Sequence, residues 1–211
     1  SGKADNTIVI FTSEQGAQFP YCKWTNWDQG VHTGFIVRWL GKVEPGTRTD
    51  AIIQYADVLP TLYEAITANE LQGIDGESFL DVLKGKSKKH RNYAYFMHNN
   101  VPEGPPYPIR SISDGKYHYI RNLNHQALYN EKHLTGRMPL NNYWPSWMFH
   151  SARDEKTLDL VTRYMLRPPE ELYDTETDPF ELNNLADDPI YITIKNHLSD
   201  KLDKWMIGQG D

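Results

Sequence analysis

The sequence predicts an α/β fold in its first half and an α+β arrangement in its second half. An apolar, β-branched run at Ile8–Phe11 ends in polar residues, and open α/β sheets present their sites at such strand ends. A helical spacing of apolar residues follows over Asp57–Ala68, with Asp57 at the N-cap position. In the second half, two alternating runs flank Asp114-Gly115, which indicates a β-hairpin.

The remaining elements follow from the same two periodicities. The pattern predicts strands at Phe35–Trp39, Ala51–Ile53 and Leu172-Tyr173, and helices at Ser78–Leu83, Leu158–Leu166 and Tyr191–Met206. Composition and period both change near residue 90. We therefore expect two domains, 1–90 and 91–211, with the terminal helix packed on a small antiparallel sheet in the second.

Composition narrows the class of protein. The chain has 211 residues, of which 39% are hydrophobic and 24% charged, which is typical of a globular protein that buries a core. Its net charge of −6 argues against nucleic acid as a partner. No apolar run approaches the roughly 20 residues of a membrane span. A single cysteine, Cys22, excludes an internal disulfide framework.

Aromatic residues are frequent, with 13 Tyr and 6 Trp. They are scattered through the chain, which favours packing by amphipathic rings. A surface that stacks on sugar rings is the other interpretation. Under that interpretation Trp144 and Trp147 would hold a glycan.

The segment between the first two strands carries the candidate chemistry. Glu14 and Gln15 precede Gly16, and the glycine permits a turn that brings a carboxylate and an amide oxygen together. Such oxygens suit Ca²⁺ or Mg²⁺, although a solvated turn explains the same residues. Lys23 lies in an aromatic-rich stretch and suits a sulfate or phosphate anion, although an exposed lysine is the simpler reading.

The ordered motifs resemble the type I sulfatases of the alkaline phosphatase superfamily. The blocks that carry the resemblance are "TIVIFTSEQG", "CKWTNWDQGVHTGFIVRW", "YADVLPTLYEAI", "GIDGESFLDVLKGK" and "ELYDTETDPFELNNLADDP". They occur in family order over nearly the whole chain. "TSEQG", the "CKWTNWD" loop and "NNYWPSW" are similar to the heparan N-sulfatase (sulfamidase) branch.

The resemblance implies a mechanism and a set of site residues. In these enzymes a formylglycine, made from Cys or Ser, attacks the sulfur of a sulfate ester or sulfamate, and one Ca²⁺ holds the sulfate oxygens. Glu14 and Gln15 match the positions of two late metal ligands, each one methylene longer than the usual Asp and Asn. Lys23 matches the lysine that contacts the sulfate and assists the leaving group.

The sequence also departs from the family pattern. His32 and Gly34 stand where Arg and Pro are usual. Cys22 is not followed by the Cys/Ser-x-Pro-x-Arg spacing, so it is not the formylglycine precursor. The early paired aspartates that bind the metal are missing as well. We therefore expect the chain to be the carboxyl-terminal part of a longer sulfatase: a remnant of its large sheet, then a small antiparallel subdomain.

The expected function is hydrolysis of sulfate esters or sulfamates on sulfated glycans such as glycosaminoglycans. The amino-terminal half of the same protein would supply the formylglycine and the remaining calcium ligands, and this part alone would be inactive. Lys23, His32, His98 and Arg110 are the expected substrate contacts, with Asn99 as a further one. The family implies a periplasmic or secreted location in bacteria, or a lysosomal one in eukaryotes.

Two other functions stay open. A non-catalytic module would bind carbohydrate or protein through the aromatic residues. A phosphodiesterase of the same superfamily would need two metals and additional His and Asp ligands, and the sequence offers no such set.

Overall fold

The computed structural model describes residues 2–135 and 143–211, and these form two compact units. The first unit comprises Ser1–Glu14 and Gly34–Ala94, and the second comprises Gln15–Thr33 and Tyr95–Asp211. The lysine-bearing segment thus leaves the first unit and packs within the second. The assignment of 1–90 and 91–211 to two sulfatase domains stays a prediction.

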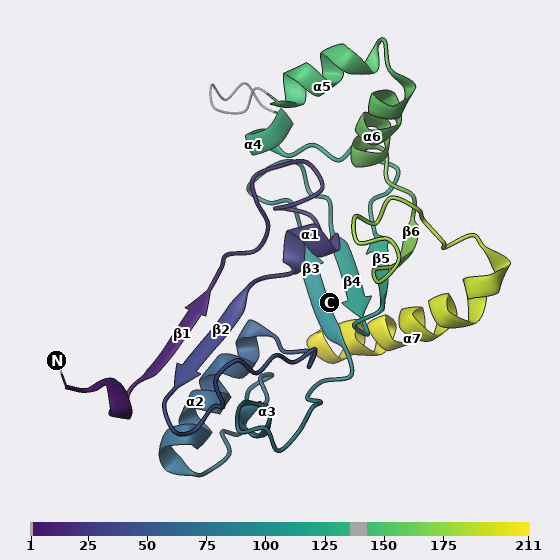
Figure 1. The fold of residues 1–211 in the computed structure, drawn as a ribbon. Helices are drawn as coiled ribbons and strands as arrows, with labels where there is room; N and C mark the ends of the chain where they lie inside the picture. The colour runs from purple at the N-terminus through teal and green to yellow at the C-terminus, as the bar shows by residue number, and fades with distance from the viewer. Residues whose placement is uncertain (1, 136–142) are drawn as a thin grey trace. The chain divides into compact units, whose positions relative to one another are not determined.

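The first unit is built on two antiparallel strands, β1 (Ile8–Thr12) and β2 (Phe35–Trp39), as Figure 1 shows. Ile8 pairs with Trp39 and Ile10 with Val37, so these four side chains share one face. The helices α2 (Val58–Thr67) and α3 (Leu80–Leu83) pack against that face. Both predicted strands and both predicted helices are confirmed. The strand predicted at 51–53 is wrong, because these residues form only an isolated bridge, Ile52 to Arg91, and no ladder.

The cap expected at Asp57 differs in detail. Asp57 precedes α2, yet its carboxylate accepts no hydrogen bond from the helix. It accepts one from the Gln54 N–H (2.9 Å), at the 3₁₀ turn η2 (Tyr55–Asp57), and two from the Arg91 guanidinium. Asp57 is thus the N-cap residue of α2, as predicted, but its carboxylate is satisfied by the Arg91 guanidinium and the Gln54 N–H and not by an N–H of the helix.

A four-stranded antiparallel sheet organises the second unit. Its strands are β3 (Ala94–His98), β4 (Ile109–Ser113), β5 (Tyr117–Asn122) and β6 (Glu170–Asp174), in the order β3-β4-β5-β6. The predicted hairpin is β4–β5, in which Ser113 pairs with His118. Gly115 adopts φ +93° in its turn, a conformation that favours glycine.

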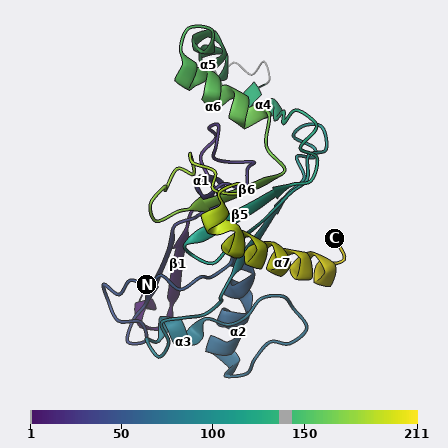
Figure 2. The ribbon, with the colours of Figure 1, turned by 90° about the vertical axis from the view of Figure 1, so that its right-hand side faces the viewer.

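The long helix α7 (Ile192–Gln209) crosses one face of this sheet (Figure 2). Leu198 and Leu202 of the helix are fully buried. Trp205 stacks on Tyr95 with ring centroids 4.9 Å apart. The helix predicted over 191–206 is thus confirmed and extends three residues further.

An aromatic core fills the other side of the sheet, and several helices contribute to it. They are α1 (Asp28–Val31), α4 (Lys132–Thr135), α5 (Tyr143–Ser151) and α6 (Glu155–Met165). Two short 3₁₀ turns, η1 (Ala4–Asn6) and η3 (Pro189–Tyr191), complete the elements of the described residues. Buried in this core are Trp27, Tyr107, Ile109, Ile120, Tyr129, Leu134, Trp144, Val161, Tyr164 and Tyr173. Across the described ranges, no helix has the length and apolarity to cross a membrane.

Candidate functional site

Gly16 brings the start of the 15–33 segment against Lys23. Its φ is +51°, and a Cβ at this position would lie 2.6 Å from the Lys23 backbone nitrogen. That nitrogen donates to the Ala17 carbonyl oxygen at 3.0 Å. Only glycine fits both the backbone conformation and the close approach, so the sequence Gln15-Gly16 fixes where Gln15 lies relative to the Lys23 backbone.

The second half of the segment is held by α1. A Cβ on Gly30 would lie 2.4 Å from the Cys22 carbonyl oxygen and 2.6 Å from Thr25 Oγ1. Thr25 Oγ1 in turn donates to the Cys22 carbonyl at 2.6 Å. The short helix therefore packs directly on the backbone that flanks Lys23. Burial raises the pKa of the Cys22 thiol, which disfavours its thiolate form.

Lys23 and Trp24 form the chemical centre of the segment. The Lys23 ammonium lies over the Trp24 ring, 5.5 Å from its centroid, which is a cation–π distance. The Trp24 indole also stacks on His133 at 4.9 Å and 13°. The Tyr129 hydroxyl donates to the Trp24 carbonyl oxygen. These contacts hold a cation beside a rigid aromatic surface.

A pocket of about 330 Å³ lies between this segment and β3 in the second unit. Its size is at the lower end of those that accept a small ligand. Its lining residues are Gln15, Trp24, Thr25, Asn26, Gly30, Val31, Tyr95, Phe96, Met97 and His98. Gln15 and His98, two predicted site residues that lie far apart in the sequence, thus line the same pocket.

His98 presents a neutral imidazole. Its Nε2 atom is buried and has no hydrogen-bond partner within the described part of the chain. Burial lowers the pKa of His98, and the nearby Arg167 charge lowers it further, while Glu103 acts in the opposite direction. A neutral imidazole with one unpaired nitrogen can accept or donate a single hydrogen bond. That chemistry suits a sugar hydroxyl or amide better than a sulfate.

Arg110 and Asn99, two other predicted contacts, bind one another. Arg110 Nη1 donates to Asn99 Oδ1 at 2.9 Å. The same guanidinium pairs with Asp211, with Nη2 to Oδ1 at 2.7 Å and Nε to Oδ2. Arg110 is buried, and its charge lowers the pKa of Asp211. A substrate anion at Arg110 would have to replace the Asp211 carboxylate.

His32 lies at the end of α1 and is exposed. Its Nδ1 is 3.3 Å from Asp28 Oδ2, and this hydrogen bond raises the pKa of His32 against a smaller opposing effect of burial. The Asp28 carboxylate therefore favours the charged form of His32 relative to a free histidine. Whether His32 contacts substrate stays a prediction.

The glycan surface expected at Trp144 is wrong. Trp144 is only 5% exposed and packs on Tyr164, with ring centroids 5.1 Å apart. Because it belongs to the aromatic core, it offers no face to a ligand. Its neighbour Trp147 is half-buried against the same core. For these two residues the other interpretation of the aromatic content, packing in the core, is confirmed.

Comparison with known proteins identifies the family. Residues 19–145, more than half of the chain, match the family described as N-sulphoglucosamine sulphohydrolase, C-terminal. The chain belongs to this sulfatase family. An ulvan-active sulfatase of Formosa agariphila is 36% identical over 209 residues, which are 98% of this chain and 39% of that protein. Human N-sulphoglucosamine sulphohydrolase is 25% identical over 229 residues, 97% of this chain and 42% of the relative.

The fold agrees with that sulfatase family. A protein solved in complex with its substrate, D-glucosamine-2-N,6-O-disulfate, aligns with a TM-score of 0.65 at 19% identity. The alignment covers 97% of this chain and 35% of that one. The mixed α/β architecture with two antiparallel sheets is thus the carboxyl-terminal part of an alkaline-phosphatase-like sulfatase. The chain spans about two fifths of the length of the curated relatives described above.

The calcium that the sulfatase family implies can be tested only in part against these residues. Glu14 and Gln15 are both exposed and carry the oxygen donors that Ca²⁺ prefers. Over residues 2–135 and 143–211, no three His, Cys, Asp or Glu side chains cluster as a metal site would require. The donor chemistry fits, and a complete coordination shell of about six to eight oxygens needs further ligands.

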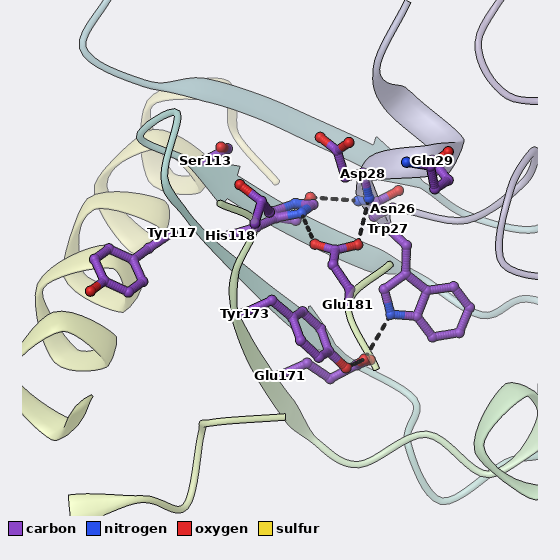
Figure 3. A network of polar contacts seen from close by, with 12 residues as sticks. Asn26, Trp27, Asp28, Gln29, Ser113, Tyr117, His118, Glu171, Tyr173 and Glu181 are labelled. Atoms are coloured by element: carbon purple, nitrogen blue, oxygen red, sulfur yellow. Dashed lines mark hydrogen bonds and ion pairs between the residues drawn. The ribbon is translucent and has the colours of Figure 1, made fainter. Parts of the chain in front are cut away.

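Sequence reasoning missed two buried carboxylates of the sulfatase signature "ELYDTETDPFELNNLADDP". Glu171 and Glu181 both reach the 15–33 segment, as the dashed lines in Figure 3 show. The signature itself was visible in the sequence. The neighbouring sequence does not indicate that these two glutamates point inward, because their partners lie 144 and 153 residues away along the chain.

Proposed function

We propose that the chain is the carboxyl-terminal part of a sulfatase that hydrolyses sulfate esters or sulfamates on sulfated glycans. It would complete an active site whose nucleophile lies in the amino-terminal half of the same protein. The observation that carries the proposal is the pocket beside Trp24, with the Lys23 ammonium over that ring. Membership of the sulfatase family and the glycan named in the Formosa relative support it.

The chemistry that this chain contributes is electrostatic and positional. The Lys23 ammonium would contact the sulfate and stabilise the charge that develops on the leaving oxygen or nitrogen. Gln15 and Glu14 would supply two oxygens to a Ca²⁺ that holds the sulfate. A formylglycine, once formed in the other half, supplies the covalent nucleophile.

The remaining predicted contacts would recognise the sugar. His98 would exchange one hydrogen bond with a hydroxyl or amide group, because its ring is neutral. His32 would attract the polyanionic chain, because its pKa is raised. Arg110 would take part only if Asp211 moves from its guanidinium.

The substrate branch is part of the proposal. The notable candidate is an N-sulfated glucosamine, in a heparan N-sulfatase-like enzyme, which the family description and the human relative favour. The Formosa relative is named for another sulfated polysaccharide, ulvan. Either substrate fits a location outside the cytoplasm, in the periplasm, the medium or the lysosome.

The test is sulfate release by the whole enzyme from N-sulfated and O-sulfated disaccharides and from ulvan fragments. We expect Lys23→Ala to lower kcat/KM by about 100-fold or more, the usual effect of removing one stabilising group. Lys204→Ala, an exposed lysine of α7, is the matched control and should leave turnover unchanged. Full activity of Lys23→Ala, or no sulfate release from any substrate, contradicts the proposal.

A module that only binds glycans is the alternative, and the same pocket motivates it. It predicts that the 211-residue chain binds sulfated oligosaccharides in calorimetry although the whole protein releases no sulfate. Trp24→Ala should then abolish binding, whereas Trp144→Ala would act only through the fold.

A further inference from the structure

Two buried carboxylates connect the sulfatase signature to the segment that carries Lys23. Glu171 and Glu181 are each 1% exposed, although acidic side chains are rarely buried without partners. We propose that Glu171 and Glu181 are positioning residues, which hold the 22–30 backbone in place and thereby aim Lys23. The positioning of the backbone stands on its own, and its catalytic consequence rests on the proposed function.

Glu171 holds the segment through Trp27. Its Oε2 accepts hydrogen bonds from Trp27 Nε1 at 2.9 Å and from the Tyr173 hydroxyl at 2.5 Å. Its Oε1 accepts one from Asn122 Nδ2 at 2.7 Å. The indole is itself 1% exposed. Three donors on one buried carboxylate fix its orientation, and the orientation fixes the indole that it binds.

Glu181 holds the first turn of α1. Its Oε2 accepts the Asp28 backbone N–H at 2.6 Å, and its Oε1 lies 2.7 Å from His118 Nδ1. Figure 3 shows Glu181 between these two partners, which come from β5 and from the start of α1. Its own backbone has φ +52°, an uncommon conformation for a residue other than glycine. The contacts with Asp28 and His118 hold the side chain in one direction.

The position of α1 affects Lys23 because the helix packs closely on the backbone of Cys22, the residue before that lysine. Asp28 begins α1, and Gly30 of the same helix packs on the Cys22 carbonyl with no room for a Cβ. Trp27 and Asp28 are consecutive, so the two glutamates accept hydrogen bonds from adjacent residues. A shift of α1 would move Cys22, and Lys23 follows it directly.

Positive charges lie near the aromatic partners of Glu171, and a histidine pairs with Glu181. The Arg167 guanidinium lies 4.0 Å from the Trp27 ring centroid, and Arg163 lies 5.5 Å from the Tyr173 ring centroid. Burial alone lowers the pKa of His118, and the Glu181 carboxylate outweighs it, so the pKa is raised. A neutral glutamine at 171 or 181 would keep the acceptor oxygen but lose this attraction.

Glu170 provides a matched control in the same strand. Its carboxylate accepts hydrogen bonds from the Tyr119 hydroxyl and from Lys195 Nζ at 3.1 Å. Neither partner belongs to the 15–33 segment. A general loss of stability from removing a β6 carboxylate would appear in Glu170→Ala as well, whereas a specific effect on the segment would not.

The first experiment measures amide hydrogen exchange in the whole protein, without substrate. We expect Glu181→Ala to accelerate exchange of amides 25–31 by about tenfold or more relative to the strands β4 and β5. Glu181→Gln should show a smaller change, because its amide oxygen still accepts the Asp28 N–H. Glu170→Ala should leave 25–31 unchanged.

A milder variant covers the case in which Glu181→Ala fails to fold. Trp27→Phe keeps a ring in the core and removes only the donor to Glu171. It should accelerate exchange in 22–30 while β4 and β5 stay protected. Unchanged exchange in that segment, or an equal change in Glu170→Ala, overturns the positioning role.

The second experiment measures turnover by the whole enzyme. Lys23 would stabilise mainly the transition state, so misplacing it should affect kcat more than KM. Glu181→Ala should therefore lower kcat by about tenfold or more with little change in KM, and Glu181→Gln should keep part of the lost activity. If the wild-type enzyme releases no sulfate, the proposed function fails, while the exchange experiment still decides the positioning. A faster exchange with unaltered kcat overturns the link from the glutamates to Lys23.

Discussion

Asp57 is the best-defined buried charge of the first unit. Its carboxylate is fully buried and accepts hydrogen bonds from Arg91 and from the Glu77 N–H at 2.9 Å. His90 Nε2 lies 3.2 Å from the same carboxylate. One side chain therefore ties the turn before α2 to residues 77 and 90–91, and its loss should release all of them together.

We predict that Asp57→Asn destabilises the first unit by about 3–5 kcal/mol, because a buried cation loses its partner. Asp81→Asn is the control, since the Asp81–Lys86 pair is 65% exposed on both sides and such pairs contribute about 0–1 kcal/mol. Denaturant unfolding followed by circular dichroism measures both. Similar effects of the two substitutions would show that the buried pair contributes no more than a surface one.

The same residue predicts a pH dependence. Burial alone raises the pKa of Asp57, and hydrogen bonds from Arg91, Glu77 and Gln54 outweigh it, so the pKa is lowered. Its contribution to stability is therefore complete above the pKa of an unfolded aspartate, about 3.9, and is lost as the pH falls through the lower folded value. Urea midpoints measured below pH 5 should fall more steeply for the wild type than for Asp57→Asn.

Gly16 offers a second test at the scale of one residue. Gly16→Ala meets the Lys23 backbone nitrogen at 2.6 Å, whereas Gly41→Ala has nothing within 4 Å, and both glycines have positive φ. We expect Gly41→Ala to cost about 1 kcal/mol, the conformational penalty alone, and Gly16→Ala to cost more. Thermal unfolding of the two variants measures the difference, and equal melting temperatures would mean that the segment yields to the added methyl group.

The elements with a clear period or turn signal could be predicted from the sequence, and two helices without one could not. The spacing of apolar residues was sufficient for α2, α6 and α7, and the Asp114-Gly115 turn was sufficient for β4–β5. The four-residue helix α1 has no such pattern, because its packing comes from Gly30 and a glutamate far along the chain. The helix α5 was also not predicted from the sequence.

The candidate site shows the same division. The sequence indicated Gln15 just past a strand, Lys23 in an aromatic-rich stretch and His98 as an expected substrate contact, and both Gln15 and His98 line the pocket. The sequence did not reveal that Asp211 forms an ion pair with the Arg110 guanidinium or that Trp144 is buried in the aromatic core. Both depend on contacts across more than the length of a single element, which periodicity does not encode.

The packing of α7 gives a prediction at the scale of the element. Leu198 is fully buried under the sheet, whereas Ile207 of the same helix is 77% exposed. We expect Leu198→Ala to cost about 2–5 kcal/mol through lost burial and a cavity, and Ile207→Ala to change stability little. Unfolding of the two variants in urea is the measurement. Comparable losses would mean that α7 does not stabilise the sheet through its buried face.

At the scale of the whole molecule, the proposed calcium site needs more ligands than Glu14 and Gln15. Glu14 and Gln15 can provide two oxygens, whereas Ca²⁺ takes about six to eight. We predict that the 211-residue chain releases no sulfate and shows no saturable Ca²⁺ binding below about 1 mM, the range of weak sites. Calorimetric titration measures this. Micromolar binding that disappears in Glu14→Ala would show instead that the chain holds a complete site.

The two units also divide the chain in an unusual order. The first unit is formed by residues on both sides of the 15–33 segment, and that segment belongs to the second unit. A substitution in 15–33 should therefore be felt by the four-stranded sheet rather than by the β1–β2 pair that flanks the segment in sequence.

The separations of 144 and 153 residues between Trp27, Asp28 and their glutamates have a consequence for synthesis. Chains leave the ribosome amino terminus first, at about 5–20 residues per second. The 15–33 segment is thus made before Glu171, and its buried indole gains its carboxylate only when residue 171 emerges. For that interval Trp27 and its aromatic neighbours lack the residues that later bury them, so the 15–33 segment can contact other chains during translation.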